Sequence, residues 1–253
     1  MKTATFAATL SIALMTSAHA VIVASDNGSN YGSGWTNGSN GGTGFGAWSF
    51  ATQGGGYKGA YVGDPANIGV SGMGSTALAL YANGGGNPGI FALRSFNNAL
   101  GVGDSFSLQW GINWDSGIGQ KSIILYTGSG FLTYALQVSN QGSASISVLA
   151  ATSGLVSDIG FGYGTNAMTW TFTQTTATSV TVTANDRDGS GSYSQTFAVN
   201  GPLTGFGMFA NGFSDGNGNR EPYYNNFTIN AVPAPGAIAL FGAAGLLAAR
   251  RRK

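Results

Sequence analysis

Ser105-Phe-Ser-Leu-Gln-Trp110 and Thr178-Ser-Val-Thr-Val-Thr183 are the two stretches that decide the fold of this chain. In both, polar and apolar residues alternate. Because successive side chains of a strand point to opposite faces of a sheet, each stretch would turn one side to an apolar core and the other to water. No helical period of 3.6 residues occurs before the C-terminal tail, so the pattern predicts an all-β protein.

Similar β-rich runs recur along the chain and are separated by turns rich in Gly, Asn and Ser. Short strands at regular spacing, with turn signals between them, are typical of a two-sheet β-sandwich of the jelly-roll type. The predicted strands lie near residues 47–53, 58–62, 76–81, 89–95, 104–112, 120–126, 131–138, 144–149, 167–174, 178–184, 192–199, 204–210 and 223–230.

The composition fits one large domain between two ends that do not belong to it. Of 253 residues, 43% are hydrophobic and only 8% are charged, so the chain is not a charge-rich disordered one. A body of roughly 210 residues can bury a sizeable core as a single sandwich. The chain contains no cysteine, which excludes disulfides, thiol catalysis and thiolate metal sites.

The charge of the body is mildly negative. Between residues 21 and 231 there are five basic and nine acidic residues, a net formal charge of −4, and the basic residues form no stripe. Binding to nucleic acid through its phosphates would need such a stripe. We therefore expect no nucleic-acid partner.

The first 20 residues have the features of a secretory signal peptide. Lys2 precedes an apolar stretch from Ala4 to Met15, and Ala18 and Ala20 supply the small residues of a cleavage site. An uncleaved N-terminal anchor is the alternative. Cleavage before Val21 would remove the only histidine of the chain, which excludes Ser-His-Asp triads, His-bearing zinc sites and c-type haem attachment from the mature protein.

Residues 232–253 combine two prolines, an apolar segment and a basic end. At about 1.5 Å per residue, an apolar helix of roughly 18 residues reaches about 27 Å, close to the ~30 Å core of a bilayer. The terminal cations favour the cytoplasmic side and leave the body outside. The residues of this predicted sorting signal are Val232, Pro233, Pro235, Gly236, Arg250, Arg251, Arg252 and Lys253.

This tail resembles the PEP-CTERM sorting signal of Gram-negative bacteria. The resemblance implies processing by an exosortase-type enzyme after transient arrest in the inner membrane, and delivery to the cell surface or to an extracellular matrix that contains exopolysaccharide. One departure is that Ala234 stands where the motif has glutamate, which puts cleavage in doubt. An ordinary, unprocessed tail anchor is the alternative. The chain thus divides into a signal peptide (1–20), a lead-in (21–45), a sandwich body (46–231) and a tail (232–253).

The Gly/Asn/Ser-rich lead-in is expected to be loop, with Tyr31 and Trp35 docked on the sheet. Together with the predicted last strand, Tyr223–Ile229, the segment 34–48 resembles the ends of concanavalin A-like secreted bacterial domains. In those domains the last strand pairs back near the first. The resemblance implies an architecture that often binds glycans and is also often structural, so the fold alone does not give a function.

Two clusters are candidate ligand sites. Asp186, Asp188 and Ser190 offer oxygens at alternate positions, as a Ca²⁺ loop does, although an Asp-Gly hairpin turn explains the same residues and no glutamate closes the loop. The second cluster could form a platform on which sugars stack, with four aromatic residues and one carboxylate: Trp110, Trp114, Asp115, Tyr223 and Tyr224. Ordinary core packing is the alternative explanation for these aromatic residues.

Three functions follow, in this order. The first is a non-enzymatic surface or matrix protein associated with exopolysaccharide. The second is a carbohydrate-binding lectin or adhesin module. The third is a glycan-active hydrolase or lyase, which would need two carboxylates about 5 to 9.5 Å apart. Because the Glu-x-Asp-x-x-Glu strand motif of laminarinase-like enzymes is missing, we expect no catalytic residues and no cofactor other than Ca²⁺.

Overall fold

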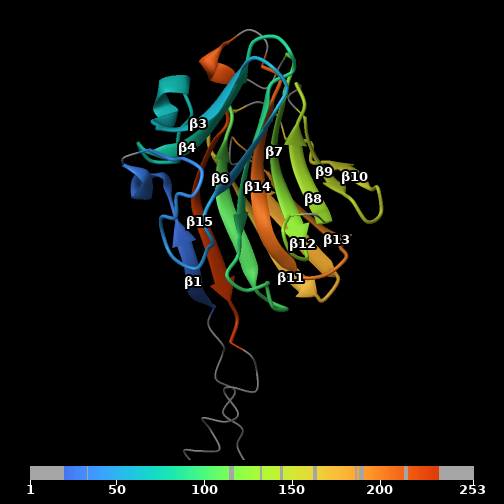
Figure 1. Ribbon diagram of the computed structural model, residues 1–253. Helices are drawn as coiled ribbons and strands as arrows, with labels where there is room; N and C mark the ends of the chain where they lie inside the picture. Colours follow the sequence, from blue (N-terminus) through green and yellow to red (C-terminus); the bar gives the residue numbers. More distant parts are fainter. Residues whose placement is uncertain are drawn as a thin grey trace, which may run out of the picture.

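The computed structural model consists of two packed antiparallel sheets (Figure 1). The structure describes residues 20–233, except 33, 114–116, 132, 143–144, 162–163, 186, 188–190 and 214–215. The predicted all-β, two-sheet sandwich is confirmed. Ala18 and the tail from residue 234 onward lie outside the described part, so the signal peptide, its cleavage and the C-terminal apolar helix stay predictions.

The larger sheet has eight strands and the smaller one has seven. The eight-stranded sheet has the order β13 (Ser192–Ala198), β12 (Ser179–Asn185), β11 (Met168–Thr176), β6 (Ser105–Gly111), β15 (Tyr223–Ala231), β4 (Ala77–Asn83) and β3 (Tyr57–Gly63), and β1 (Val21–Asp26) also pairs with β15. The seven-stranded sheet has the order β10 (Val156–Asp158), β9 (Ile146–Ala150), β8 (Thr133–Asn140), β7 (Gln120–Thr127), β14 (Leu203–Asn211), β5 (Gly89–Ser95) and β2 (Ser49–Gln53). Short 3-10 helices occur at η1 (Gly28–Tyr31), η2 (Pro65–Ile68) and η3 (Gly218–Arg220).

Each predicted strand corresponds to a strand of the structure, and two strands were not predicted. β10 has only three residues, too few to show an alternation. β1 lies in the segment expected to be loop, and its apolar residues Val21, Ile22 and Val23 are exposed. Its structure comes from pairing with β15 rather than from a buried side.

The core contains the apolar positions of the two deciding stretches. Phe106, Leu108 and Trp110 of β6 and Val180 and Val182 of β12 are all completely buried. In β6 and β12 the alternation therefore assigns the two faces correctly. The core is rich in aromatic pairs, each of which adds about 0.5–1.5 kcal/mol beyond the burial of area.

The outer side of the eight-stranded sheet is lined with small polar side chains, and we call it the hydroxyl face. Strand register aligns them in rows across five strands, and hydroxyl pairs such as Ser107–Thr228 and Thr181–Thr196 lie 2.7 Å apart. The face comprises Ser105, Ser107, Gln109, Thr169, Thr171, Thr173, Thr181, Thr183, Ser194, Thr196 and Thr228.

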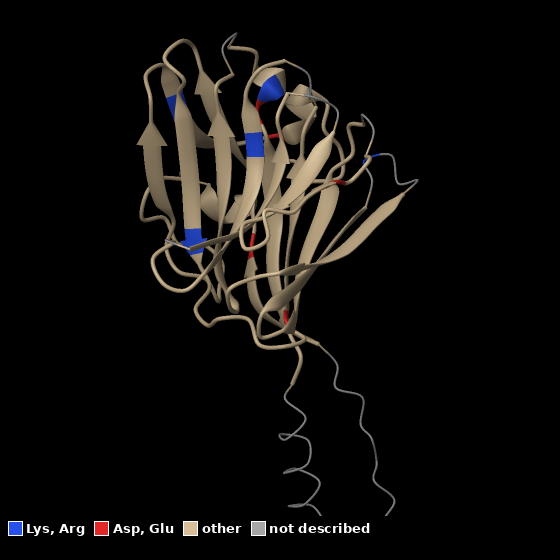
Figure 2. Ribbon diagram, turned by 90° about the vertical axis from the view of Figure 1, so that its right-hand side faces the viewer, with Lys and Arg blue, Asp and Glu red and all other residues tan. Residues whose placement is uncertain are grey.

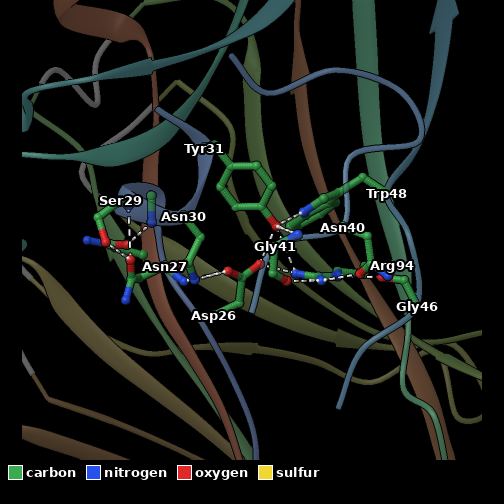
Figure 3. A network of polar contacts seen from close by, with 12 residues as sticks. Asp26, Asn27, Ser29, Asn30, Tyr31, Asn40, Gly41, Gly46, Trp48 and Arg94 are labelled. Carbon is green, nitrogen blue, oxygen red and sulfur yellow. Dashed lines mark hydrogen bonds and ion pairs between the residues drawn. The ribbon is translucent and has the colours of Figure 1, made fainter. Parts of the chain in front are cut away.

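A buried ion pair connects the two sheets (Figure 3). Asp26 belongs to β1 of the larger sheet and Arg94 to β5 of the smaller one, and both side chains are completely buried. The guanidinium also donates to the carbonyls of Gly41 and Gly46 at 2.7 and 2.8 Å. These bonds satisfy charges that would otherwise be costly to bury.

The same network orders the lead-in. Tyr31 donates a hydrogen bond to Asp26, and Trp48 Nε1 donates to the Tyr31 hydroxyl at 2.7 Å. Burial and the bond to Asp26 raise the pKa of Tyr31 to about 12. Tyr31 and Trp35 are 4% and 2% exposed, which confirms that both aromatics dock on the sandwich.

The first and last strands of the described chain lie side by side. β1 pairs with β15 from Val21–Ala231 to Asp26–Phe227. The last strand thus pairs with the first strand of the described chain, whereas the first predicted strand, β2, belongs to the other sheet. Both ends leave the same end of the sandwich (Figure 1). Beyond β15, the Val232 amide donates to Asp104 at 2.9 Å. No helix within the described residues is long and apolar enough to cross a membrane.

Candidate functional site

The outer side of the seven-stranded sheet carries apolar side chains, unlike the hydroxyl face. In β7, Ile123 and Leu125 belong to the core, whereas Ile124 and Tyr126 belong to a separate apolar cluster. Because neighbouring residues of a strand point to opposite faces, this cluster lies on the outside. We call it the aromatic face; it comprises Phe91, Leu93, Ile124, Tyr126, Phe131, Tyr134 and Phe209.

Strand register builds the centre of the aromatic face. Phe91 of β5 pairs with Phe209 of β14, and their rings stack at 4.2 Å with an angle of 22°. Further along β14, Gly207 also faces outward, and a Cβ there would lie 2.8 Å from Leu93 Cδ2 and 3.3 Å from Tyr126 Cε2. The missing side chain lets Leu93 and Tyr126 lie low over the strand.

Phe131 extends the aromatic face from the turn after β7. Its φ is +58°, a conformation that is unusual for a bulky residue. Its ring stands edge-on to Tyr126 at 5.4 Å and 80°. It also covers Gly205, where a Cβ would lie 3.0 Å from Phe131 Cε1.

A row of amides and hydroxyls adjoins the aromatic side chains. Ser122 of β7 lies opposite Ser139 of β8, and Ile124 lies opposite Gln137. Gln120 Nε2 donates to both serine hydroxyls at 3.1 Å, and Gln137 Nε2 donates to Ser122 at 3.0 Å. We call Gln120, Ser122, Gln137 and Ser139 the polar row.

The charged residues of these central strands point inward. Arg94 and Lys121 are 0% and 1% exposed, and Lys121 Nζ lies 5.4 Å over the Phe213 ring. Figure 2 shows how sparse charged residues are on the described ribbon. Within the described part of β2, β5, β7, β8 and β14, no charged side chain faces outward. Burial raises the pKa of Tyr126 to about 12, so its phenol stays protonated at neutral pH.

Three of the five residues predicted as a stacking platform are buried away from the aromatic face. Trp110, Tyr223 and Tyr224 are at most 2% exposed, and Trp110 stacks on Tyr224 at 6.3 Å inside the core. Trp110 shares its inward side with the other apolar residues of β6, so its ring faces cannot reach a sugar. Trp114 and Asp115 lie outside the described residues.

The predicted metal ligands Asp186, Asp188 and Ser190 also lie outside the described residues. Among the residues that are described, no group of three or more His, Cys, Asp or Glu side chains could hold a metal ion. Ca²⁺ at that loop therefore stays a prediction.

Glu221, the only glutamate of the chain, has a packing role. Its carboxylate accepts hydrogen bonds from the Tyr61 hydroxyl at 2.5 Å and from Asn83 Nδ2 at 3.2 Å. These bonds fix the residue after η3 to β3 and β4. Burial raises the pKa of Glu221, and the two hydrogen bonds lower it in part.

A signal for the aromatic face is present in the sequence. The runs Ile90-Phe91-Ala92-Leu93 and Ile123-Ile124-Leu125-Tyr126 are apolar at both odd and even positions. Such runs are typical of strands covered on both sides. Since no third layer covers the seven-stranded sheet in the described part of the chain, the second apolar side lies at the surface.

Comparisons with known proteins give no family. No family model and no curated protein matches this chain. Among solved structures, it is similar to the CBM2 module of the evolved Dit of Lactobacillus casei BL23 phage J-1, with 13% identity over 65% of this chain and 81% of that chain and a TM-score of 0.44.

Two further structures show the range of these similarities. The VIP36 exoplasmic/lumenal domain in its Ca²⁺/Man3GlcNAc-bound form has 8% identity over 74% of this chain and 84% of that chain, with a TM-score of 0.42. A putative β-glucanase from Mycobacterium abscessus has 14% identity over 57% of this chain and 75% of that chain, with a TM-score of 0.39. These identities and TM-scores are too low to transfer a function or a residue.

Proposed function

We propose that this chain is a carbohydrate-binding protein that binds glycans on its aromatic face without catalysing a reaction. The observation that carries the proposal is the position of the aromatic face beside the polar row, on the outer side of a sheet. Phe91, Leu93, Phe131 and Tyr134 are partly exposed there, whereas Ile124, Tyr126 and Phe209 beneath them are buried. Apolar side chains that gather at a surface are typical of binding sites. Aromatic rings suit the apolar C–H faces of sugars, and the partly exposed amides of Gln120 and Gln137 suit the sugar hydroxyls. Ser122 and Ser139 are buried and hold these amides in place.

Two of the described carboxylates have structural roles, which favours binding over hydrolysis. Glycoside hydrolysis uses two carboxylates about 5 to 9.5 Å apart across the bond. Here Asp26 is engaged in the buried ion pair, and Glu221 is bonded to Tyr61 and Asn83. Neither carboxylate is directed to the aromatic face.

The sequence of the two ends supports a proposal about where the glycan is found. Residues 1–20 and 232–253 predict export and sorting by an exosortase-type enzyme, so the glycan would be an extracellular polysaccharide at the cell surface or in the matrix. Mass spectrometry of the protein from membrane and medium fractions tests this proposal. A C-terminus at Lys253 in both fractions would contradict processing and leave binding untouched.

The binding itself is tested with the full-length protein on arrays of neutral and acidic polysaccharides. Phe91→Ala removes one stacked ring of the aromatic face, and Thr171→Ala, on the hydroxyl face, is the matched control. Truncating a residue that anchors a ligand commonly costs at least about 1.4 kcal/mol, or about tenfold in affinity. We expect a loss of this size for Phe91→Ala only. Equal affinities of both variants and the wild type would reject the aromatic face as the site.

A further inference from the structure

A cavity of about 230 Å³ opens at one end of the aromatic face. It is lined by Ser95, Phe96, Thr204 and the turn Gly128–Phe131. Ser95 pairs with the outward-facing Gly205, and Phe131 belongs to the aromatic face itself. The cavity is therefore continuous with the face and lies where strands β5, β7 and β14 end.

The turn is held in a defined conformation. Gly128 and Gly130 have φ values of +75° and +71°, and Phe131 has +58°. A bulky residue in this region costs of the order of 1–3 kcal/mol and persists where its surroundings offset the strain. Here the contact of the Phe131 ring with Tyr126 at 5.4 Å provides the offset. The ring thus lines the cavity and contacts Tyr126 of the aromatic face.

The chemistry of the lining is aromatic and hydroxylic. Thr204 Oγ1 donates to the carbonyl of Gly128 at 2.5 Å and fixes the turn. Ser95 and Ser129 are exposed, so their hydroxyls can meet a ligand. All lining residues are uncharged, as is the outward side of the adjoining strands, so a charged ligand would leave water without gaining an opposite charge.

The size of the cavity fits one ring. Pockets that enclose drug-sized ligands have about 300–1,000 Å³, whereas a cavity of about 150 Å³ holds a single benzene molecule. At about 230 Å³, the cavity can take one six-membered sugar ring with its hydroxyls. The next residues of a glycan would have to lie outside it, on the aromatic face.

From these observations we propose that the cavity is a terminal subsite, which binds the end residue of an uncharged glycan whose following residues lie on the aromatic face. This inference rests on the proposed function. It adds two properties: the glycan is neutral, and the protein recognises a chain end. Phe131 would determine specificity by packing on that end residue.

The test uses the full-length protein and a length series of the neutral oligosaccharide that it binds best on the array. Phe131→Gly removes the ring and retains a residue that tolerates the left-handed backbone. Ser129→Trp fills the cavity and leaves Phe131 in place. We expect each variant to bind the short oligosaccharides about tenfold more weakly, and to lose competition by the monosaccharide.

The outcomes separate the two proposals. If Phe131→Gly and Ser129→Trp bind every length as the wild type does, while Phe91→Ala binds weakly, the terminal subsite is rejected and the glycan-binding face stands. Preference of the wild type for acidic glycans would also reject the neutral subsite. If the wild type binds no glycan of any class, the proposed function itself fails.

Discussion

The two outer faces of this sandwich are both formed by antiparallel strands, but one face is polar and the other is apolar. On the eight-stranded sheet the outward positions are Ser, Thr and Gln in register across five strands. On the seven-stranded sheet the central outward positions are Phe, Leu, Ile and Tyr. Among the described residues, the central strands of both sheets have no charged side chain that faces outward. The two faces therefore differ in hydration and shape rather than in charge.

Only one of the two outer faces has the polarity expected of a solvated sheet. A solvated antiparallel sheet normally alternates apolar-in and polar-out, and the hydroxyl face follows that rule. The aromatic face departs from it at positions that lie outside the core between the sheets. Such departures are expected at functional sites.

The largest effect should come from breaking the link between the two sheets. Arg94→Met leaves Asp26 as an uncompensated buried carboxylate, which costs about 3–5 kcal/mol. Urea unfolding followed by fluorescence should show a correspondingly lower midpoint. The double variant Asp26→Leu/Arg94→Met serves as the control and should recover much of the loss. A midpoint close to the wild type for Arg94→Met alone would mean that the ion pair does not hold the sheets.

A lysine substitution on the aromatic face should lower the stability of the protein more than one on the hydroxyl face. Ile124 is 6% exposed, and Ile124→Lys forfeits the burial of an aliphatic side chain, roughly 2 kcal/mol. Thr171→Lys, on the hydroxyl face, should stay within about 0.5 kcal/mol of the wild type. Thermal and urea midpoints measure both. Equal losses would show that the two faces are equally packed.

Two glutamines offer a closer comparison of binding. Gln137 donates to Ser122 in the polar row at 3.0 Å, and Gln109 donates to the Gly72 carbonyl beside the hydroxyl face at 3.0 Å. If Gln137 also meets sugar hydroxyls, Gln137→Ala should weaken glycan binding by about 0.5–1.5 kcal/mol, the net worth of a hydrogen bond. Gln109→Ala should leave calorimetric affinity unchanged. The reverse order would move the binding site to the hydroxyl face.

The smallest effect concerns pH. Since burial raises the pKa of Glu221, the folded state holds this proton more tightly than the unfolded state does. The resulting stability is complete below the ordinary glutamate pKa of about 4.3 and is lost as pH rises through the raised value. The urea midpoint should fall over that window, and Glu221→Gln should flatten the dependence.

Glycan binding should not share this pH dependence. The aromatic face has no charged group on its central strands, and Tyr126 ionises only near pH 12. Affinities measured across neutral pH should therefore be constant. A change that follows the Glu221 titration would place the ligand near β3 and β4 instead.

Much of the fold could be predicted from the sequence, because alternation and turn residues are local signals. They give the strands of both sheets and the inward side of β6 and β12. These local signals do not predict β1, because β1 is a strand only through its pairing with β15, more than two hundred residues away. Nor do they give the ion pair of Asp26 and Arg94, residues 68 positions apart.

The candidate site is harder to predict from the sequence than the fold is. Large aromatics with neighbouring polar residues suit sugars, which favours Trp110 and Tyr224 as a sugar platform, but strand alternation places both in the core. The aromatic face depends on the register that brings Phe91 to Phe209 and Tyr126 to Tyr134. No single strand contains that information.

The pairing of β1 with β15 has a mechanical consequence. A force that separates the two adjacent ends would peel β1 away rung by rung, since Val21 and Ala231 lie at the same end of the ladder. A force between the C-terminal end and a ligand on the aromatic face would instead load β15 along its length. That strand lies inside its sheet and is bonded to β6, β4 and β1, so many rungs would resist together. The same sandwich would thus open easily in one direction and carry tension in the other.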